Sequence, residues 1–409
     1  MPSIQALMVD RVGTTTAITN VVDSFEFTYG SSNGYDQPQP SVLSLVLYGN
    51  SINGITVNPT DLIGQSIYLK IGRNAFATPY MTITSVRMEP IDSSADNNLL
   101  TISAVGGLYR MSKYLANRSV IASDAGTTWL ANLALDSAVQ WGDLNQAIQW
   151  NDYGDPILWN DYYWNGLDVN GSTVTGMNVI ADTRTWQAST GIAENAYQYV
   201  QNACQVNDSW LSETAGGWAT LVAPLSYYAG VLPSSQTIDC STDVVFSGIE
   251  TTSDASEKVN DVTVTNGTVT AYSADGNDIA SWGDYAVTQT STLDNILDLQ
   301  NISDRILKSH ASGTRTLSRI TVDLDVSNLT LWLAPFLLTL TNLPTAYTDP
   351  AGTTMQVRGF SMRGNTYHTE ADLVLVPKTV WDYGQTMWNQ TTAAWNAYLT
   401  ALSTWNDVP

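Results

Sequence analysis

Charged residues are scarce in this sequence, and basic residues are the scarcest. Only 13% of the 409 residues are charged, and 16 Lys and Arg stand against 38 Asp and Glu, which gives a formal net charge of −22. Soluble domains average about 25% charged residues. The lack of any basic cluster excludes an interface that grips nucleic-acid phosphates. A surface poor in charge and rich in aromatic and amide side chains indicates contact with other subunits, whereas the acidic excess by itself also fits plain solubility.

Cysteine and histidine are almost absent, which limits the chemistry available. Cys204 and Cys240 fit no zinc or redox spacing. His310 follows a predicted helix, where a C-terminal cap is its ordinary role, and His368 falls in a predicted strand. No nucleophile motif accompanies either of them, so we expect no enzyme. A glycosidase-like carboxylate pair stays open, although most Asp residues fall in turns whose backbone they cap.

Long apolar runs and cofactor motifs are also missing. The most apolar stretch, 329–340, is interrupted by Pro335 and is shorter than the ~20 residues of a membrane helix. Residues 1–20 alternate apolar and polar residues and have no basic start, so we expect no signal peptide. We therefore expect synthesis in the host cytoplasm. The stretches 168–171 and 275–278 lack the spacing of a calcium loop, and no phosphate-binding glycine loop occurs. We expect no cofactor and no metal.

What the sequence does contain is a succession of β patterns interrupted by one mixed block. Residues 1–108 read as an all-β first domain, and residues 109–245 as an α+β domain. Residues 246–379 read as a second β domain with one helix, and residues 380–409 as a Trp-rich C-terminal helix or arm. The predicted helices cover 127–139, 191–206 and 294–308. The main predicted strands cover 42–48, 66–71, 80–88, 99–105, 258–265, 269–272, 285–289, 315–326, 335–341, 356–364 and 368–377. The fold class is therefore mainly β with an α+β middle domain.

Tryptophan is concentrated in two segments. A Trp-Asn-Asp-Tyr motif occurs twice, nine residues apart, and the C-terminal tryptophans lie largely at seven-residue steps. Such spacing suits a helix that packs on a partner, and equally one that folds back on its own domain. The candidate partner-docking residues are Trp150, Trp159, Trp164, Trp381, Trp388 and Trp395.

Three passages carry a resemblance to a known family. They are LLTISAVGGL at 99–108, KVNDVTVT at 258–265 with the helix that follows at 298–309, and LLTLTNLP at 337–344 between strands at 318–326 and 355–377. In this order they resemble the minor tail or baseplate hub proteins of siphophages that infect actinobacteria. The resemblance covers most of residues 1–380 and rests on order and pattern.

The resemblance implies a trimeric hub, or alternatively a hexamer, whose first and third domains are tube-like β-barrels around a lumen. Such a subunit would lie at the tail tip of the virion, contact the distal tail protein, the tape measure protein and other tail-tip proteins, and let DNA pass during ejection. Acidic loops would suit that lumen because like charges suppress adsorption of DNA. Candidate lumen residues are Asp61, Asp92 and Asp96.

Two other classes stay open. One is a distal tail adaptor ring protein of the same organelle. Such an adaptor typically has one ring-forming β domain, whereas this sequence has two strand-rich blocks, which favours the hub. The other is a carbohydrate-binding or hydrolytic β-protein, which would use the 14 Trp and 20 Tyr residues. The missing signal peptide and the depleted charge weigh against that second class.

Overall fold

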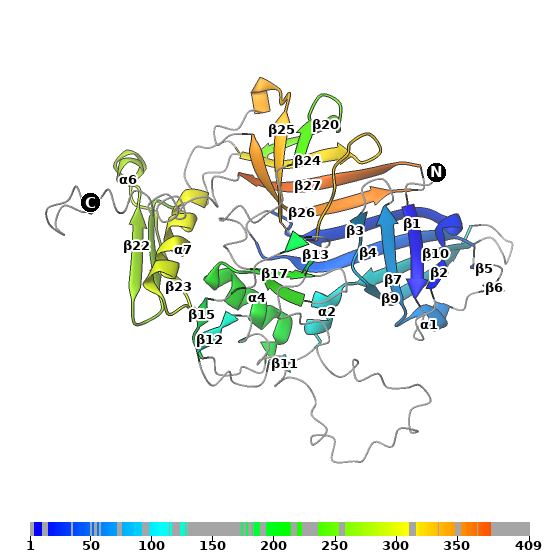
Figure 1. The fold of residues 1–409 in the computed structure, drawn as a ribbon, viewed down its shortest axis with the longest axis horizontal. Coiled ribbons are helices and arrows are strands. Elements are labelled where there is room, and N and C mark those ends of the chain that lie inside the picture. Colours follow the sequence, from blue (N-terminus) through cyan, green and yellow to red (C-terminus); the bar gives the residue numbers. More distant parts are fainter. Residues whose placement is uncertain are drawn as a thin grey trace, which may run out of the picture.

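One large, curled sheet dominates the protein (Figure 1). The computed structural model describes residues 4–377 with gaps, of which the longest are 130–172 and 223–235. The sheet has 14 strands. Their bounds are β1 (Ile4–Val9), β2 (Thr15–Ala17), β3 (Val22–Gly30), β4 (Gln39–Tyr48), β7 (Ser66–Ile71), β8 (Phe76–Ala77), β9 (Met81–Pro90), β10 (Asn98–Val105), β19 (Gln236–Asp239), β20 (Val244–Thr252), β24 (Thr316–Asp323), β25 (Phe336–Thr341), β26 (Thr354–Gly364) and β27 (Thr369–Pro377).

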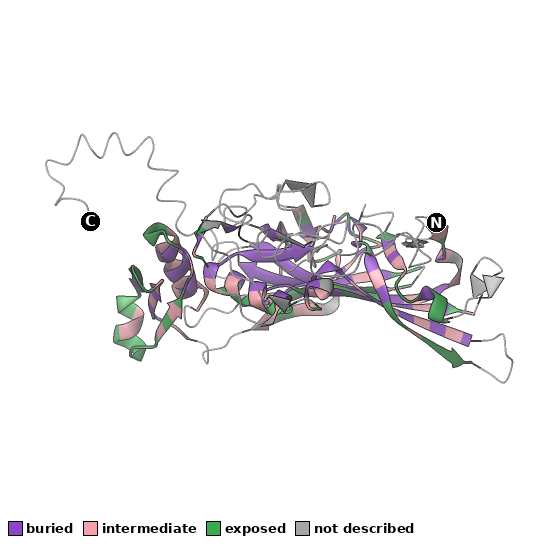
Figure 2. Cartoon of the chain, turned by 90° about the horizontal axis from the view of Figure 1, so that it is seen from below, coloured by how far each residue is buried: buried purple, intermediate pink, exposed green. Residues whose placement is uncertain are grey.

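The main path through this sheet runs β2-β1-β7-β9-β10-β4-β3-β26-β27-β24-β20. Every neighbouring pair from β9 to β20 is antiparallel. Buried and partly exposed residues alternate along these strands, as expected when one face of a sheet packs on a core. In β10, Leu100, Ile102 and Ala104 are buried, and the residues between them are partly exposed. Figure 2 shows this change of colour from residue to residue along the strands.

The buried face of the sheet holds the principal core. Phe27 and Phe76 both pack on Phe360, with ring centroids 6.1 and 5.6 Å apart. Leucines from β4 and β25 and the segment 329–333 complete this cluster. The first and last parts of the chain therefore share one hydrophobic core.

The first and last parts of the chain join where β3 pairs with β26. Gly30 and Gly359 stand opposite each other in this pair. A Cβ on Gly359 would overlap the backbone of Ser31, and one on Gly30, which has φ +84°, would overlap the carbonyl of Arg358. Glycine is required at this crossing because the two backbones approach closely.

A second core lies beside the large sheet. It contains α4 (Ala196–Asn207) and α7 (Ile296–Ser309), which covers one face of a three-stranded sheet. That small sheet lies at the left of Figure 1, with α6 (Gly276–Trp282) at one end. Its strands are β21 (Asp261–Thr265), β22 (Thr270–Ala274) and β23 (Ala286–Thr290).

Three separate two-stranded sheets belong to the middle part of the chain. They pair β11 (Leu115–Ala116) with β16 (Glu194–Asn195), β12 (Asp124–Ala125) with β15 (Thr185–Trp186), and β17 (Trp210–Glu213) with β18 (Ala219–Val222).

The remaining elements are short. They are the hairpins β5 (Ser51–Ile52) with β6 (Ile55–Thr56) and β13 (Thr173–Val174) with β14 (Met177–Asn178), the helices α1 (Pro59–Leu62) and α2 (Gly107–Met111), and the 3-10 turns η1 (Thr19–Val21) and η4 (Thr345–Tyr347). Among the residues that the structure describes, no helix is long and apolar enough to span a membrane.

The mainly β fold class with a mixed block is confirmed. The helix predicted at 191–206 begins at Ala196, because the Asn195 side chain accepts a hydrogen bond from the Gln198 amide and caps it there. The stretch 275–278 opens the short helix α6, whose N-cap is Asp275. The helix predicted at 127–139 falls mostly outside the described residues. The division into four domains stays a prediction, and within 246–379 the segment from β21 to α7 belongs to the second core.

Candidate functional surface

The face of the large sheet turned away from the core is polar. We call this surface the polar face and define it by residues that alternate with the core positions of their strands. Apolar side chains, those of Val42, Val46, Leu99 and Val105, lie among its polar members. The polar members include Ser24, Glu26, Thr28, Ser44, Arg87, Glu89, Thr101, Ser103, Glu250, Arg319, Thr321, Asp323, Ser361, Arg363, Glu370 and Asp372.

One row across the polar face is made of charged pairs. Arg363 stands opposite both Glu370 and Glu26, and Asp323 stands opposite Glu370. Arg363 forms ion pairs of 3.2 Å with Glu370 and with Asp372. Cross-strand pairs of opposite charge stabilise a sheet, whereas like charges directly opposite destabilise it. Four carboxylates with one arginine leave this row net negative.

Next to this row the polar face is hollowed. The hollow has a volume of about 460 Å³ and opens to solvent. Side chains of both signs line it, among them Glu26, Arg363, His368 and Glu370, together with Ser24 and Ser44. The hollow is therefore formed by strands from both ends of the chain.

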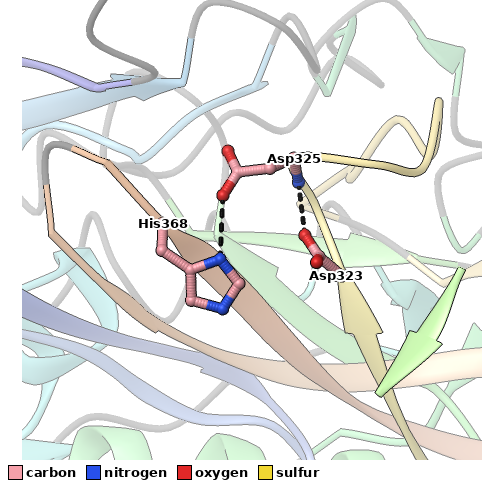
Figure 3. Close-up of side chains that lie close together, drawn as sticks. All are labelled: Asp323, Asp325 and His368. Carbon is pink, nitrogen blue, oxygen red and sulfur yellow. Dashed lines mark hydrogen bonds and ion pairs between the residues drawn. The ribbon is translucent and has the colours of Figure 1, made fainter. Parts of the chain in front are cut away.

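A cluster of titratable groups lies at the edge of the hollow (Figure 3). Asp323 ends β24, Asp325 follows in the turn, and His368 directly precedes β27. Nδ1 of His368 lies 3.0 Å from Asp325 Oδ2, and Nε2 lies 3.0 Å from Glu370 Oε1. The hydrogen bond to Glu370, more than the one to Asp325, raises the pKa of His368, and the same bond lowers the pKa of Glu370.

A buried carboxylate, Glu213 of β17, connects the middle block to the large sheet. It accepts hydrogen bonds from the Ser41 hydroxyl and from the Leu108 amide, the latter at 2.7 Å. Burial raises the pKa of Glu213. Close by, the Tyr29 hydroxyl donates to the Leu333 carbonyl at 2.5 Å, and the Arg358 guanidinium lies 3.8 Å from the Trp210 ring centroid. The contacts of Glu213 and Trp210 join β17 to the large sheet.

Most residues predicted as candidate sites lie outside the described part of the chain. This applies to Trp150, Trp159, Trp164, Trp381, Trp388, Trp395, Asp92 and Asp96. Asp61 is exposed on α1, whose Leu62 packs into the core, and it is not a member of the polar face. Its role in a lumen stays a prediction.

Sequence reasoning did not single out the acidic members of the polar face. Glu26, Glu370 and Asp372 sit in strands at alternating positions, and that alternation was the available signal. His310 has the expected cap role, since it ends α7 and its Nδ1 lies 2.9 Å from the Ile306 carbonyl. Cys204 is buried and Cys240 is half-buried, and both are free thiols.

No family model matches this chain, and no curated protein matches it. Solved structures do. A tail protein from Neisseria meningitidis MC58 superposes with a TM-score of 0.58 at 12% identity, covering 93% of this chain and 98% of that one. A 43 kDa tail protein of prophage MuSo2 from Shewanella oneidensis gives 0.55 at 9% identity, over 92% and 99%. A prophage tail protein from Listeria monocytogenes EGD-e gives 0.50 at 10% identity, over 91% and 95%.

These likenesses extend over nearly the whole chain, so the protein has the fold of phage and prophage tail proteins. The expected resemblance holds at this level. The narrower assignment to phages of actinobacteria stays a prediction.

Proposed function

We propose that this protein is a structural subunit of a phage tail, a baseplate hub that forms a ring with copies of itself. The polar face would line the passage through which DNA leaves the virion. The fold shared with phage tail proteins supports a role in a tail, and the large sheet supports the ring. No covalent chemistry is required for this task.

The observation that carries the proposal is a run of eight antiparallel strands with two open edges. The run extends from β9 to β20. β20 pairs only with β24, and β9 meets β7 only near Met81 and Thr82, among the described residues. Open edges present unpaired backbone donors and acceptors, and free proteins normally shield them.

The directions of these two edges favour a head-to-tail ring. Eight strands that alternate in direction place β9 and β20 antiparallel to each other. A copy rotated about an axis along the strands would therefore set its β20 against this β9 and continue the alternation. Heterologous contacts of this kind generate rings when the rotation closes.

The exposure of β9 agrees with this role. From Thr84 to Pro90 both faces of the strand are exposed or half-exposed, and Met88 is 42% exposed. This part of β9 pairs with β10 on one side but, exposed on both faces, gains little from the core. Pairing with a neighbour would bury its backbone and its apolar side chains.

The charge of the polar face suits a passage for DNA. On the polar face the carboxylates outnumber the arginines, and the whole chain carries a net charge of −22. The carboxylates are Glu26, Glu89, Glu250, Asp323, Glu370 and Asp372, and the arginines are Arg87, Arg319 and Arg363. Phosphates are repelled by such a wall, so DNA would slide past it without binding. In the same proposal Asp61, Asp92 and Asp96 add acidic loops to the lumen.

Other parts of the proposal follow from the sequence. The ring would contain three copies, with six as the alternative, and would contact the distal tail and tape measure proteins. The tryptophans of the two Trp-rich segments, among them Trp150 and Trp388, would dock neighbouring tail-tip proteins. Residues 1–108 and 246–379 would supply the tube and residues 109–245 the periphery.

Edge-blocking variants test the ring. Consecutive N–H groups of a strand point to opposite sides, so one of Ser85→Pro and Val86→Pro removes a donor on the open edge of β9. Light scattering and negative-stain microscopy of the wild type should show rings with a mass that is a multiple of 44.4 kDa. That proline variant should be a folded monomer, whereas alanine at the same position should leave rings intact. A monomeric wild type, or rings in both proline variants, would contradict the proposal.

A further inference from the structure

Two carboxylates face each other across β24 and β27. Asp323 is the direct cross-strand neighbour of Glu370, and Asp372 is the next residue on the same side of β27. Asp325 follows at the end of β24. Like charges in direct opposition destabilise a strand pair. Arg363 neutralises part of this charge through Glu370 and Asp372, and His368 lies against Asp325 and Glu370. The four carboxylates still outnumber these two basic side chains, so this end of the sheet favours a further cation.

The donor atoms are already gathered. One ligand atom each from Asp323, Asp325 and His368 lie within 4.8 Å of one another. Nδ1 of His368 is 3.0 Å from Asp325 Oδ2, whereas Nε2 faces Glu370 on the other side of the ring. Two ligands that bind one metal at about 2.1 Å and at right angles lie about 3 Å apart. The spacing is that of neighbouring ligands in a coordination shell.

The backbone holds the carboxylates in place. The Asp325 amide donates to Asp323 Oδ1 at 2.8 Å, and the Thr369 amide donates to Asp325 Oδ2 at 2.9 Å. Such outer contacts orient ligands before a metal arrives. Figure 3 shows Asp323 at the end of β24, Asp325 beyond it, and His368 across from Asp325. The hollow of about 460 Å³, lined by His368 and Glu370, leaves room for water ligands.

We propose that Asp323, Asp325 and His368 bind a divalent transition-metal ion such as Mn²⁺ or Zn²⁺, while Glu370 holds the other ring nitrogen of His368. The imidazole nitrogen favours these ions over Ca²⁺, which takes oxygen ligands. The ion joins the turn after β24 to the start of β27, so it fastens this end of the polar face. The inference concerns one chain alone and does not depend on a ring.

Titration of the full chain with MnCl₂ and with ZnCl₂ tests this site. Isothermal titration should give one ion per chain, and binding should weaken at least tenfold in His368→Ala and in Asp325→Asn. Asp372→Asn is the matched control, because it removes an equal charge from the same face without removing a proposed ligand, and it should bind like the wild type.

A thermal melt of each variant without metal separates loss of the site from loss of the fold. Zn²⁺ should raise the melting temperature of the wild type and of Asp372→Asn, but not of His368→Ala. The proposal is overturned if the wild type binds neither ion at millimolar concentration. It is equally overturned if all three variants weaken binding alike, since that result would mean general attraction to an acidic surface.

Discussion

The two faces of the large sheet are built from the same strands, but one face is apolar and buried and the other is largely polar and exposed. On β26, Phe360 and Met362 are buried in the core, while Ser361 and Arg363 between them lie on the polar face. The core face is closed by aromatic packing from both ends of the chain. The polar face has paired charges, hydroxyls and a hollow. Stability is therefore expected to depend on one face and interaction with partners on the other.

The crossing of β3 and β26 should tolerate change least. Gly359→Val places a branched side chain where a Cβ already overlaps the Ser31 backbone. We therefore expect the variant not to fold, or its free energy of unfolding to fall by at least about 4 kcal/mol. Gly276→Ala is the control, because nothing lies within 4 Å of its Cβ and it should be nearly neutral. Chemical denaturation followed by circular dichroism measures both. A stable Gly359→Val would show that the two halves do not depend on this crossing.

Neighbouring residues on opposite faces give the most direct contrast. Phe360→Ala opens a cavity among Phe27, Tyr29 and Phe76 and should lower the free energy of unfolding by about 3–5 kcal/mol. Ser361→Ala, one residue away, should change it by less than about 0.5 kcal/mol. Equal costs for the two substitutions would remove the distinction between the faces.

The junction behind the sheet should depend on pH. Because the folded-state pKa of Glu213 is raised above its unfolded value, its stabilising contribution is full below the unfolded pKa and is lost as pH rises through the folded pKa. Glu213→Gln removes the titration and keeps an oxygen for the Leu108 amide. We expect this variant to be more stable than the wild type at neutral pH, because the buried carboxylate must ionise there and the amide does not. The difference should vanish near pH 4, and a difference independent of pH would contradict this account.

The smallest effect on stability is expected on the polar face itself. Arg363 is exposed, so Arg363→Ala should lower the free energy of unfolding by less than about 1 kcal/mol, and by less still at high salt. Urea melts at low and high salt measure this. If Arg363→Ala lowered the free energy of unfolding as much as Phe360→Ala does, the polar face would contribute to stability as much as the core, and the distinction drawn here would be wrong.

Much of the large sheet could be predicted from sequence because its signals are local. Alternation located β4, β10, β26 and β27 to within a few residues, and apolar spacing located α7. Strand pairing is not local. Nothing in the periodicity of β3 or β26 says that they pair across more than 300 residues, or that Gly30 meets Gly359 there.

The candidate site was less accessible to sequence reasoning for the same reason. The pair Asp325 and His368 is 43 residues apart in the chain, and each residue alone resembles an ordinary turn or strand residue. Glu370 became visible only through its register with Asp323. The tryptophans chosen from sequence were prominent by composition, and composition does not place a side chain in space.

Cross-linking between the two open edges tests the ring most directly. Arg87 on β9 and Glu250 on β20 are both exposed, so Arg87→Cys with Glu250→Cys, in a Cys240→Ser background, places one reactive thiol on each edge. With a flexible bis-maleimide, the double variant should give dimers and a closed trimer on a denaturing gel, whereas each single-cysteine variant should stay monomeric. If the double variant also stays monomeric at concentrations where the wild type is assembled, the copies do not meet edge to edge and the ring proposed here is wrong.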